Sequence, residues 1–242
     1  MKLIIQIPCY NEASVIAFTV SQINKKIPGF EKVEILIIDD GSTDSTVSIA
    51  RQDKNIDHVI CMPRHRGLAK AFMAGLKACL DRGADVIVNL DADNQYNADD
   101  IEKLVLPILD GRADIVIGSR RIDQISHFSP LKKYLQKLGS KVMRALSGTN
   151  VQDATSGFRA LSRQAAMQID IFTEYTYTLE MIMQTRQKRL TLMDVPIRVN
   201  KDLRPSRLVK TPLSYFLHSI KTILFVQYLL CLGKYKNGRK GR

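Results

Sequence analysis

The chain has 242 residues, 45% of them apolar, which is enough for one sizeable core but leaves little room for two full domains. Four cysteines form no Cys-x-x-Cys pair and four histidines lack zinc-ligand spacing, which argues against a structural zinc site and favours reduced thiols in a cytoplasmic protein. Residues 1–120 carry 14 Lys and Arg against 17 Asp and Glu, whereas residues 121–242 carry 22 against 7. The second half is therefore expected to face an anionic partner.

Five short apolar runs have the length and composition of buried β-strands. They are residues 3–7, 33–38, 59–61, 86–90 and 115–117. Helical patterns lie between several of these runs, and this alternation predicts a mainly parallel sheet with helices on its faces. The first run is too short for the apolar region of a secretory signal, so we interpret it as the first strand.

Three polar clusters follow the first, second and fourth of these strands. They are Pro8-Cys9-Tyr10-Asn11-Glu12, Asp39-Asp40-Gly41-Ser42-Thr43-Asp44 and Asp91-Ala92-Asp93-Asn94-Gln95. Because ligands bind where the parallel strands of such sheets end, the three loops predict a ligand site. Asp40 and Glu12 suit the ribose and base of a nucleotide, although each by itself also fits a turn residue or helix cap. Asp44 by itself is best explained as a helix N-cap.

Asp91 and Asp93 place two carboxylates directly after a buried strand. Mg²⁺ and Mn²⁺ prefer oxygen ligands and typically bind through one or two carboxylates, while substrate phosphates complete the coordination shell. Such an ion would neutralise the charge that grows on a departing diphosphate. An Asp-x-Asp pattern is common in surface loops, but its position after this strand favours a metal site.

Residues 131–146 predict a basic amphipathic helix. Its apolar residues keep helical spacing, and lysines and an arginine occupy the remaining faces. The apolar positions are Leu131, Leu135, Leu138, Val142 and Leu146. Two interpretations stay open: the helix packs on the core with a solvated basic face, or it contacts a membrane.

Residues 213–232 are largely apolar, but His218, Lys221 and Gln227 interrupt them. The unbroken apolar part is shorter than the ~20 residues that a membrane-spanning helix needs, so we expect no span. The stretch is expected to lie in the bilayer interface with the basic tail 234–242 on lipid headgroups, or to dock on the core or on a membrane-protein partner.

The three clusters, followed by Gly118-Ser119-Arg120, occur in the order and spacing of family 2 glycosyltransferases. Over residues 3–207 the chain resembles dolichyl-phosphate mannose synthase and related polyprenyl-phosphate glycosyltransferases. The resemblance implies an α/β GT-A fold with a Rossmann-like, mainly parallel sheet. We expect this domain to span residues 1–212, followed by an apolar and basic C-terminal segment with amphipathic helical character over residues 213–242. It also implies an inverting, metal-dependent hexosyltransferase that uses a GDP- or UDP-sugar together with Mg²⁺ or Mn²⁺.

The resemblance assigns roles residue by residue. The nucleotide-binding set is Pro8, Tyr10, Glu12, Ile38, Asp40, Asp91 and Ala92. The metal set is Asp91, Asp93 and Gln95, and the set for donor or acceptor phosphate is Arg120, Lys201, Arg204, Ser206 and Arg207. The catalytic set is Asp93, Arg120 and Asp153, the last in a loop that resembles the family's acceptor loop. Glu180 matches a further acidic position of the family, without an assigned role.

Two loops depart from the family pattern. The common Asn-x-Gly before the second helix is His65-Arg66-Gly67, and the late Arg-x-x-Gly-x-Ser-Lys is Lys201-Asp202-Leu203-Arg204-Pro205-Ser206-Arg207. In the second loop the two cations are exchanged, and Pro205 stiffens the backbone. We expect phosphate neutralisation to be preserved while the choice of donor or acceptor differs.

A polyprenyl phosphate is the expected acceptor, because the excess of cations after residue 120 suits a phosphate and the apolar stretches suit a lipid. A phosphate needs no general base, whereas a sugar or polysaccharide hydroxyl would need Asp153 as a base. An inactive nucleotide-sugar-binding scaffold is a third interpretation, which the intact metal set disfavours. Nucleic acid is not an expected partner, because it would leave the acidic loops unexplained. The chain is expected to be cytoplasmic and peripherally bound to an anionic membrane surface.

Overall fold

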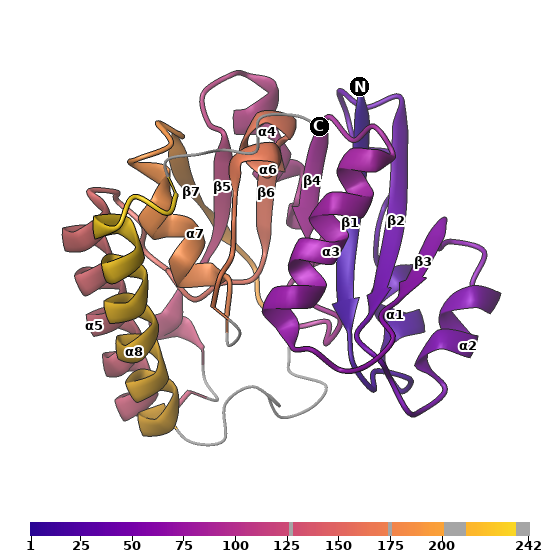
Figure 1. Cartoon of the computed structure of the whole chain (residues 1–242). Coiled ribbons are helices and arrows are strands. Elements are labelled where there is room, and N and C mark those ends of the chain that lie inside the picture. The colour runs from indigo at the N-terminus through magenta and orange to yellow at the C-terminus, as the bar shows by residue number, and fades with distance from the viewer. Residues whose placement is uncertain (126–127, 174–175, 201–211, 236–242) are drawn as a thin grey trace.

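The computed structural model describes residues 1–125, 128–173, 176–200 and 212–235, which include one seven-stranded sheet flanked by helices (Figure 1). The strands are β1 (Lys2–Cys9), β2 (Lys32–Asp39), β3 (His58–Cys61), β4 (Val86–Asn89), β5 (Ile115–Arg120), β6 (Arg159–Ser162) and β7 (Leu192–Ile197). Their order across the sheet is β3-β2-β1-β4-β6-β5-β7. All neighbours pair in parallel except β6, which is antiparallel to β4 and β5. The predicted α/β fold with a mainly parallel sheet is confirmed.

All five predicted apolar runs coincide with strands, and β6 and β7 are additional. β7 is an edge strand that contains Asp194 and Pro196, so it lacks the continuous apolar run of a strand covered on both faces. β6 has only four residues and starts with Arg159, which is fully buried. Neither strand therefore carries the pattern by which the other strands are predicted.

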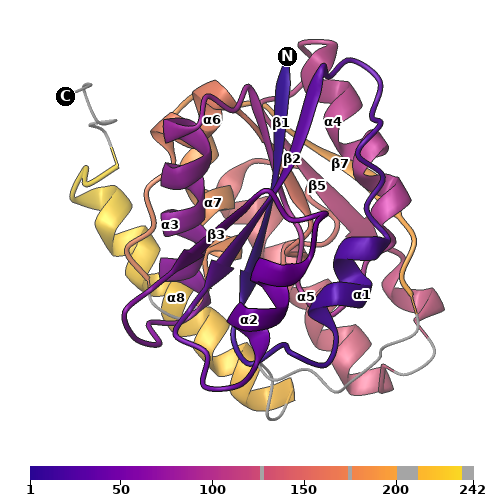
Figure 2. The same cartoon turned by 90° about the vertical axis from the view of Figure 1, so that its right-hand side faces the viewer.

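Helices cover both faces of the sheet. In chain order they are α1 (Ile16–Ser21), α2 (Thr46–Gln52), α3 (Leu68–Asp81), α4 (Ile101–Leu109), α5 (Pro130–Ser147), α6 (Arg163–Gln168), α7 (Thr178–Thr185) and α8 (Pro212–Cys231), with short 3₁₀ turns at Ala98–Asp100 and Ile122–Gln124. Figure 2 shows α1 and α4 on one side of the strands and α3 and α6 on the other. Along β1, Leu3 and Ile5 pack in the core with α1 and α4, while Ile4 packs in the core with α3 and α6. This two-sided burial explains the uninterrupted apolar strands.

A glycine sets the close approach of α3 to β1. A Cβ atom at Gly75 would lie 2.4 Å from Gln6 Oε1 and 2.9 Å from Ile38 Cδ1. Gln6 is fully buried and donates through Nε2 to Asn89 Oδ1 on β4, at 3.0 Å. The small residue thus leaves room for a polar link between the two central strands.

The predicted amphipathic helix is α5, and its ends follow from local signals. The hydroxyl of Ser129 accepts a hydrogen bond from Lys132 N at 3.2 Å, and Pro130 occupies the first turn. Gly148 ends the helix in a left-handed conformation with φ of 69°. Helix α5 therefore begins and ends where sequence chemistry places it.

Helices α5, α7 and α8 share a separate core cluster beside the β5 and β7 end of the sheet (Figure 1). Met143 of α5, Ile182 of α7 and Val226 of α8 are all fully buried in it. One face of α8 thus docks on the core, as one of the sequence interpretations expected. No helix among the described residues is both long enough and apolar enough to cross a bilayer. A domain boundary at residue 212 stays a prediction.

Candidate active site

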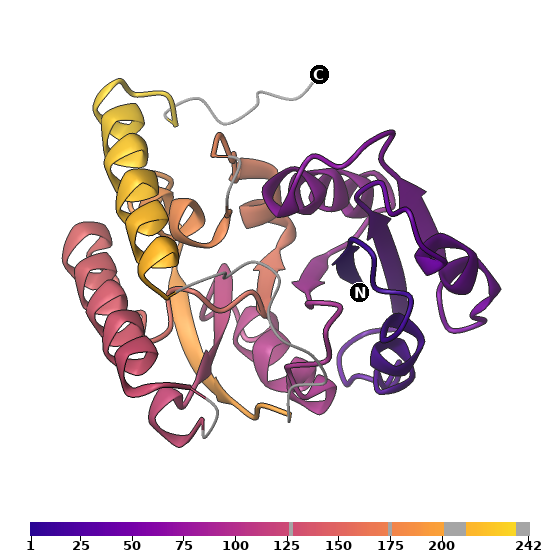
Figure 3. The same ribbon diagram turned by 90° about the horizontal axis from the view of Figure 1, so that it is seen from below.

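The predicted polar clusters lie together at one edge of the sheet. β1, β2, β4 and β5 all end at this edge, and antiparallel β6 begins there. Figure 3 looks onto the edge from below the molecule. The loop that precedes β6, residues 148–158, consequently joins the loops that follow β1, β2 and β4. The topology therefore gathers segments that are up to 150 residues apart in the chain.

The loops after β1 and β2 are fastened to each other by hydrogen bonds. Asn11 has a positive φ of 55°, and its Oδ1 accepts from Thr43 N at 2.8 Å. Glu12 N donates to Thr46 Oγ1 at 2.8 Å, and Asp44 accepts from Thr46 N at 2.9 Å. Burial raises the pKa of Asp44, but the hydrogen bonds from Thr46 outweigh it and hold the pKa below its ordinary value. The N-cap position of α2 is Ser45, so the interpretation of Asp44 as the N-cap is wrong by one residue. Asp44 instead accepts from Thr46 N, the first residue of α2, and so still stabilises the start of the helix.

The Asp40 carboxylate holds the loop between β3 and α3 at this edge of the sheet. Its two oxygens accept from Arg66 N and Gly67 N, each at 2.8 Å, and its side chain is only 4% exposed. His65 Nδ1 lies 2.8 Å from Asp40 Oδ2, and the His65 ring stacks on Tyr10. The predicted nucleotide residues Asp40 and Tyr10 are therefore joined through a residue that the sequence analysis left without a role.

Asp91 and Asp93 follow β4 at the centre of the edge. The Asp91 carboxylate lies against Gly157, where a Cβ atom would come within 2.6 Å of Asp91 Oδ2. Burial raises the pKa of Asp91, and the neighbouring charge of Asp93 raises it further. Two crowded carboxylates with this mutual repulsion suit a bound divalent cation. No group of three or more His, Cys, Asp or Glu side chains suited to a metal occurs in the described part of the chain.

Arg120 and Asp153 form a buried, two-pronged ion pair beside the aspartates. Arg120 Nε lies 2.6 Å from Asp153 Oδ2 and Nη2 lies 3.0 Å from Oδ1, with side chains 7% and 1% exposed. Arg120 Nη2 also donates to Thr155 Oγ1 at 2.9 Å. Burial raises the pKa of Asp153, but the charge and hydrogen bonds of Arg120 outweigh it and lower the pKa. Asp153 is therefore a charged anchor for the guanidinium.

The third predicted metal residue, Gln95, links the acidic residue Asp93 to Arg120. Its backbone N–H donates to Asp93 Oδ1 at 3.1 Å, and its Oε1 accepts from Arg120 Nη1 at 3.5 Å. The remaining nucleotide candidates are buried: Pro8 and Ile38 lie near the ends of β1 and β2, and Ala92 lies between the two aspartates in the loop after β4. The phosphate candidates Lys201, Arg204, Ser206 and Arg207 lie outside the described residues.

Arg159 supports the loop that contains Asp153, a role that the sequence did not predict. Its buried guanidinium donates to three backbone carbonyls, those of Ala154, Ser156 and Thr178, at 2.8 to 2.9 Å. The loop is also tied to the strands, because Gly157 O accepts from Asn89 Nδ2 at 3.0 Å. The only sequence signal was that Arg159 ends the segment Asp153-Ala154-Thr155-Ser156-Gly157-Phe158-Arg159, which resembles a family loop.

Glu180 has a structural role in the described residues. Its buried carboxylate accepts from Phe172 N at 2.8 Å, Thr173 N at 2.9 Å and the Tyr235 hydroxyl. Tyr235 lies just after α8 and is 1% exposed. Glu180 therefore fastens the end of the α8 segment to α7.

The family model for glycosyl transferase family 2 matches residues 4–170, which is more than half of the chain. The chain belongs to glycosyl transferase family 2. The predicted family and the predicted glycosyltransferase activity are confirmed.

Relatives of known or assigned activity cover most of the chain. The undecaprenyl-phosphate mannosyltransferase of Micrococcus luteus is 29% identical over 86% of this chain and 88% of its own. The UDP-N-acetylglucosamine–dolichyl-phosphate N-acetylglucosaminyltransferase of Methanococcus voltae is 31% identical over 79% of this chain and 83% of its own. These relatives differ in the sugar that their names specify.

Solved structures share the fold at lower identity. The crystal structure of glucosyl-3-phosphoglycerate synthase from Mycobacterium tuberculosis in complex with Mn²⁺, uridine diphosphate and phosphoglyceric acid has a TM-score of 0.71 and 20% identity. The match covers 93% of this chain and 78% of that one. It supports the GT-A architecture.

Proposed function

We propose that the protein transfers a sugar from a GDP- or UDP-sugar to a polyprenyl phosphate at a membrane surface. The observation that carries the proposal is the joint placement of the Asp91 and Asp93 carboxylates and the Arg120 guanidinium at one sheet edge. An acidic pair and a buried arginine side by side suit a reaction in which a metal-bound diphosphate departs and a second anion attacks. The names of the relatives support the lipid phosphate as the acceptor.

Asp91 and Asp93 would hold the divalent cation, Mg²⁺ or Mn²⁺, with Gln95 beside them. When bound, the ion supplies Lewis-acid neutralisation of the leaving diphosphate. Pro8, Tyr10, Glu12, Ile38, Asp40 and Ala92 stay our proposal for the nucleotide wall. The hydrogen bonds from Glu12 N to Thr46 Oγ1 and from Thr43 N to Asn11 Oδ1 hold this wall in place before the donor arrives.

The acceptor phosphate is proposed to bind on the β5 side, where Arg120 lies. Asp153 orients the guanidinium through two hydrogen bonds and keeps it charged at a buried position. A phosphate oxygen is already anionic, so no base is needed for its attack on the anomeric carbon. Lys201, Arg204, Ser206 and Arg207 are kept as sequence-based candidates for the same phosphate.

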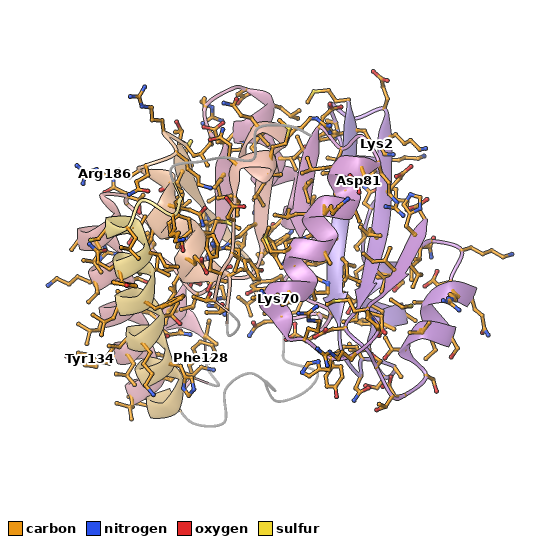
Figure 4. All side chains as sticks on the ribbon, in the orientation of Figure 1. Lys2, Lys70, Asp81, Phe128, Tyr134 and Arg186 are labelled. Carbon is orange, nitrogen blue, oxygen red and sulfur yellow. The ribbon has the colours of Figure 1, made fainter. Side chains whose placement is uncertain are left out.

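The membrane surface is proposed to meet the exposed faces of α5 and α8. Tyr134 on α5 is 63% exposed, and Leu224 and Tyr228 on α8 are 65% and 61% exposed. Figure 4 shows Phe128 and Tyr134 toward the same end of the molecule as Lys70, which lies near the active edge. Lysines on α5 suit anionic headgroups, and apolar side chains on both helices suit the acyl boundary. A cytoplasmic protein peripherally bound to lipid is consistent with this arrangement.

The proposed activity predicts product only with a phosphorylated lipid. Purified protein would be incubated with Mn²⁺, GDP-mannose or a UDP-hexose, and either undecaprenyl phosphate or the matched undecaprenol, and glycolipid would be quantified by mass spectrometry. We expect transfer from one nucleotide class to the phosphate and none to the alcohol. Transfer to a soluble sugar hydroxyl in place of the lipid phosphate would contradict the proposal.

The membrane proposal predicts that vesicle binding depends on the outer face of α8. The double substitution Leu224→Ser and Tyr228→Ser removes two exposed apolar side chains, and should weaken partitioning onto phosphatidylglycerol vesicles by on the order of 10-fold or more. Wild-type binding should also fall as salt is raised. The matched control is Phe18→Ser, a 49% exposed apolar residue on α1. Equal loss of vesicle binding in the control, or no loss in the double variant, would count against this surface. Truncation after Pro212 is a less specific test than the double substitution, because it also removes the buried core residue Val226.

A further inference from the structure

The position of the donor's base follows from the order of the strands, given the proposed function. Asp91 and Asp93 follow β4, and Arg120 ends β5 on one side of it. If the diphosphate lies at the aspartates and the acceptor at Arg120, the nucleoside must extend the other way. It then lies over the ends of β1, β2 and β3. The residues that meet the base are to be sought in the three loops that follow these strands.

An accessible aromatic surface is present in that place. The rings of Tyr10 and His65 are stacked with centroids 3.8 Å apart and an angle of 24° between their planes. The His65 side chain is 51% exposed. Two other stacked pairs in the described residues, Phe72 with Tyr177 and Tyr96 with Phe158, are buried in the core. Among the three stacked pairs of the described residues, the pair with His65 is therefore the one whose ring solvent, and hence a planar ligand, can reach.

The His65 ring is held by the carboxylate beneath it. Its Nδ1 lies 2.8 Å from Asp40 Oδ2, and the Asp40 oxygens also accept from the backbone N–H groups of Arg66 and Gly67. Gly41 lets the loop close, because a Cβ atom there would lie 2.6 Å from both Arg64 C and His65 N. Gly41 also has a φ of 73°, which favours glycine. His65 is thus pre-positioned, which lowers the ordering cost of a stacking contact.

We propose that the base of the donor nucleotide stacks on His65, and that Asp40 acts by positioning this ring. Stacking on an aromatic face accepts any base, and its strength depends on ring overlap. The asparagine of the family pattern has no ring to offer at this position. The histidine therefore makes the chain depend on a stacking contact that its relatives with asparagine do not have.

The test separates the ring from its hydrogen bond. Dissociation constants for UDP, GDP and inorganic pyrophosphate, each with Mn²⁺, would be measured by calorimetry for wild type and three variants. His65→Phe keeps a ring without the Asp40 bond, His65→Asn keeps a polar group without the ring, and His65→Ala keeps neither. His58→Ala is the control. His58 is the first residue of β3, at the end of the strand away from the site, and it pairs with Glu34.

We expect His65→Ala and His65→Asn to weaken the preferred nucleotide by on the order of 10-fold, and His65→Phe to stay within about threefold of wild type. Pyrophosphate, which has no base, should bind all variants alike. Asp40→Asn should weaken nucleotide binding in wild type, and should weaken it by a smaller factor in the His65→Ala background, because part of its effect acts through the His65 ring and the rest through the loop backbone.

Equal weakening of pyrophosphate in His65→Ala would assign His65 to loop folding and overturn the proposal. Retained nucleotide affinity in His65→Asn together with loss in His65→Phe would also overturn it, because the hydrogen bond would then be the cause. Failure of UDP and GDP to bind the wild-type protein at all would overturn the proposed function and, with it, this assignment.

Discussion

Replacement of Asp93 by alanine is expected to lower the rate of sugar transfer by roughly 10³-fold or more, with the fold intact. Asp93 and Asp91 are the carboxylates at the end of β4, and their crowding leaves an excess of negative charge for a cation to balance. On the proposed function, the variant would lose one of the two carboxylates that hold the cation. The measurement is turnover at saturating donor and Mn²⁺, together with the melting temperature.

Asp99→Ala is the matched control for this variant, since Asp99 is 67% exposed in the next turn and pairs at 3.4 Å with Arg198. It should keep wild-type turnover. EDTA should stop the wild-type reaction, and Mg²⁺ or Mn²⁺ should restore it. Unchanged turnover in Asp93→Ala, or activity that persists in EDTA, would show that the acidic pair does not bind a catalytic metal.

Arg120→Ala should lower turnover with polyprenyl phosphate by on the order of 10-fold or more, the effect of a lost charge-assisted contact. It should also destabilise the fold by about 3–5 kcal/mol, because Asp153 would remain as an unpaired buried carboxylate. Without the guanidinium, burial would raise the pKa of Asp153 and favour its protonation. Arg120→Lys keeps the charge but not the two-pronged geometry, so it should fall between wild type and alanine.

Asp153→Asn distinguishes the anchor from a general base. As an anchor, Asp153 acts through Arg120, so its loss should reduce turnover moderately and add little to Arg120→Ala. If Asp153 is a base for a hydroxyl acceptor, its replacement should abolish turnover and remove the acidic limb of the pH–rate profile.

For Arg120→Ala, turnover within about twofold of wild type, which is near what kinetics resolve, would show that Arg120 is not part of the phosphate site.

The central strands and the polar loops that follow them could be predicted from local sequence patterns. Strands such as residues 3–7 and 33–38 are buried on both faces, so their apolar runs are continuous and easy to recognise. The acidic pair Asp91 and Asp93 could be predicted because it is local, one residue apart directly after such a strand. The ends of α5 were also local, since Ser129, Pro130 and Gly148 lie at its boundaries.

The contacts between distant segments follow from strand order and could not be predicted from local patterns. β6 runs antiparallel between β4 and β5, and this inversion brings Asp153 onto Arg120, 33 residues earlier in the chain. The loop after β3 folds back over Gly41 and places His65 on Tyr10, 55 residues earlier. Local patterns carry the period and burial of each element, but not its neighbour or direction in the sheet. The pairing of charges and rings therefore depends on strand order, which long-range packing determines.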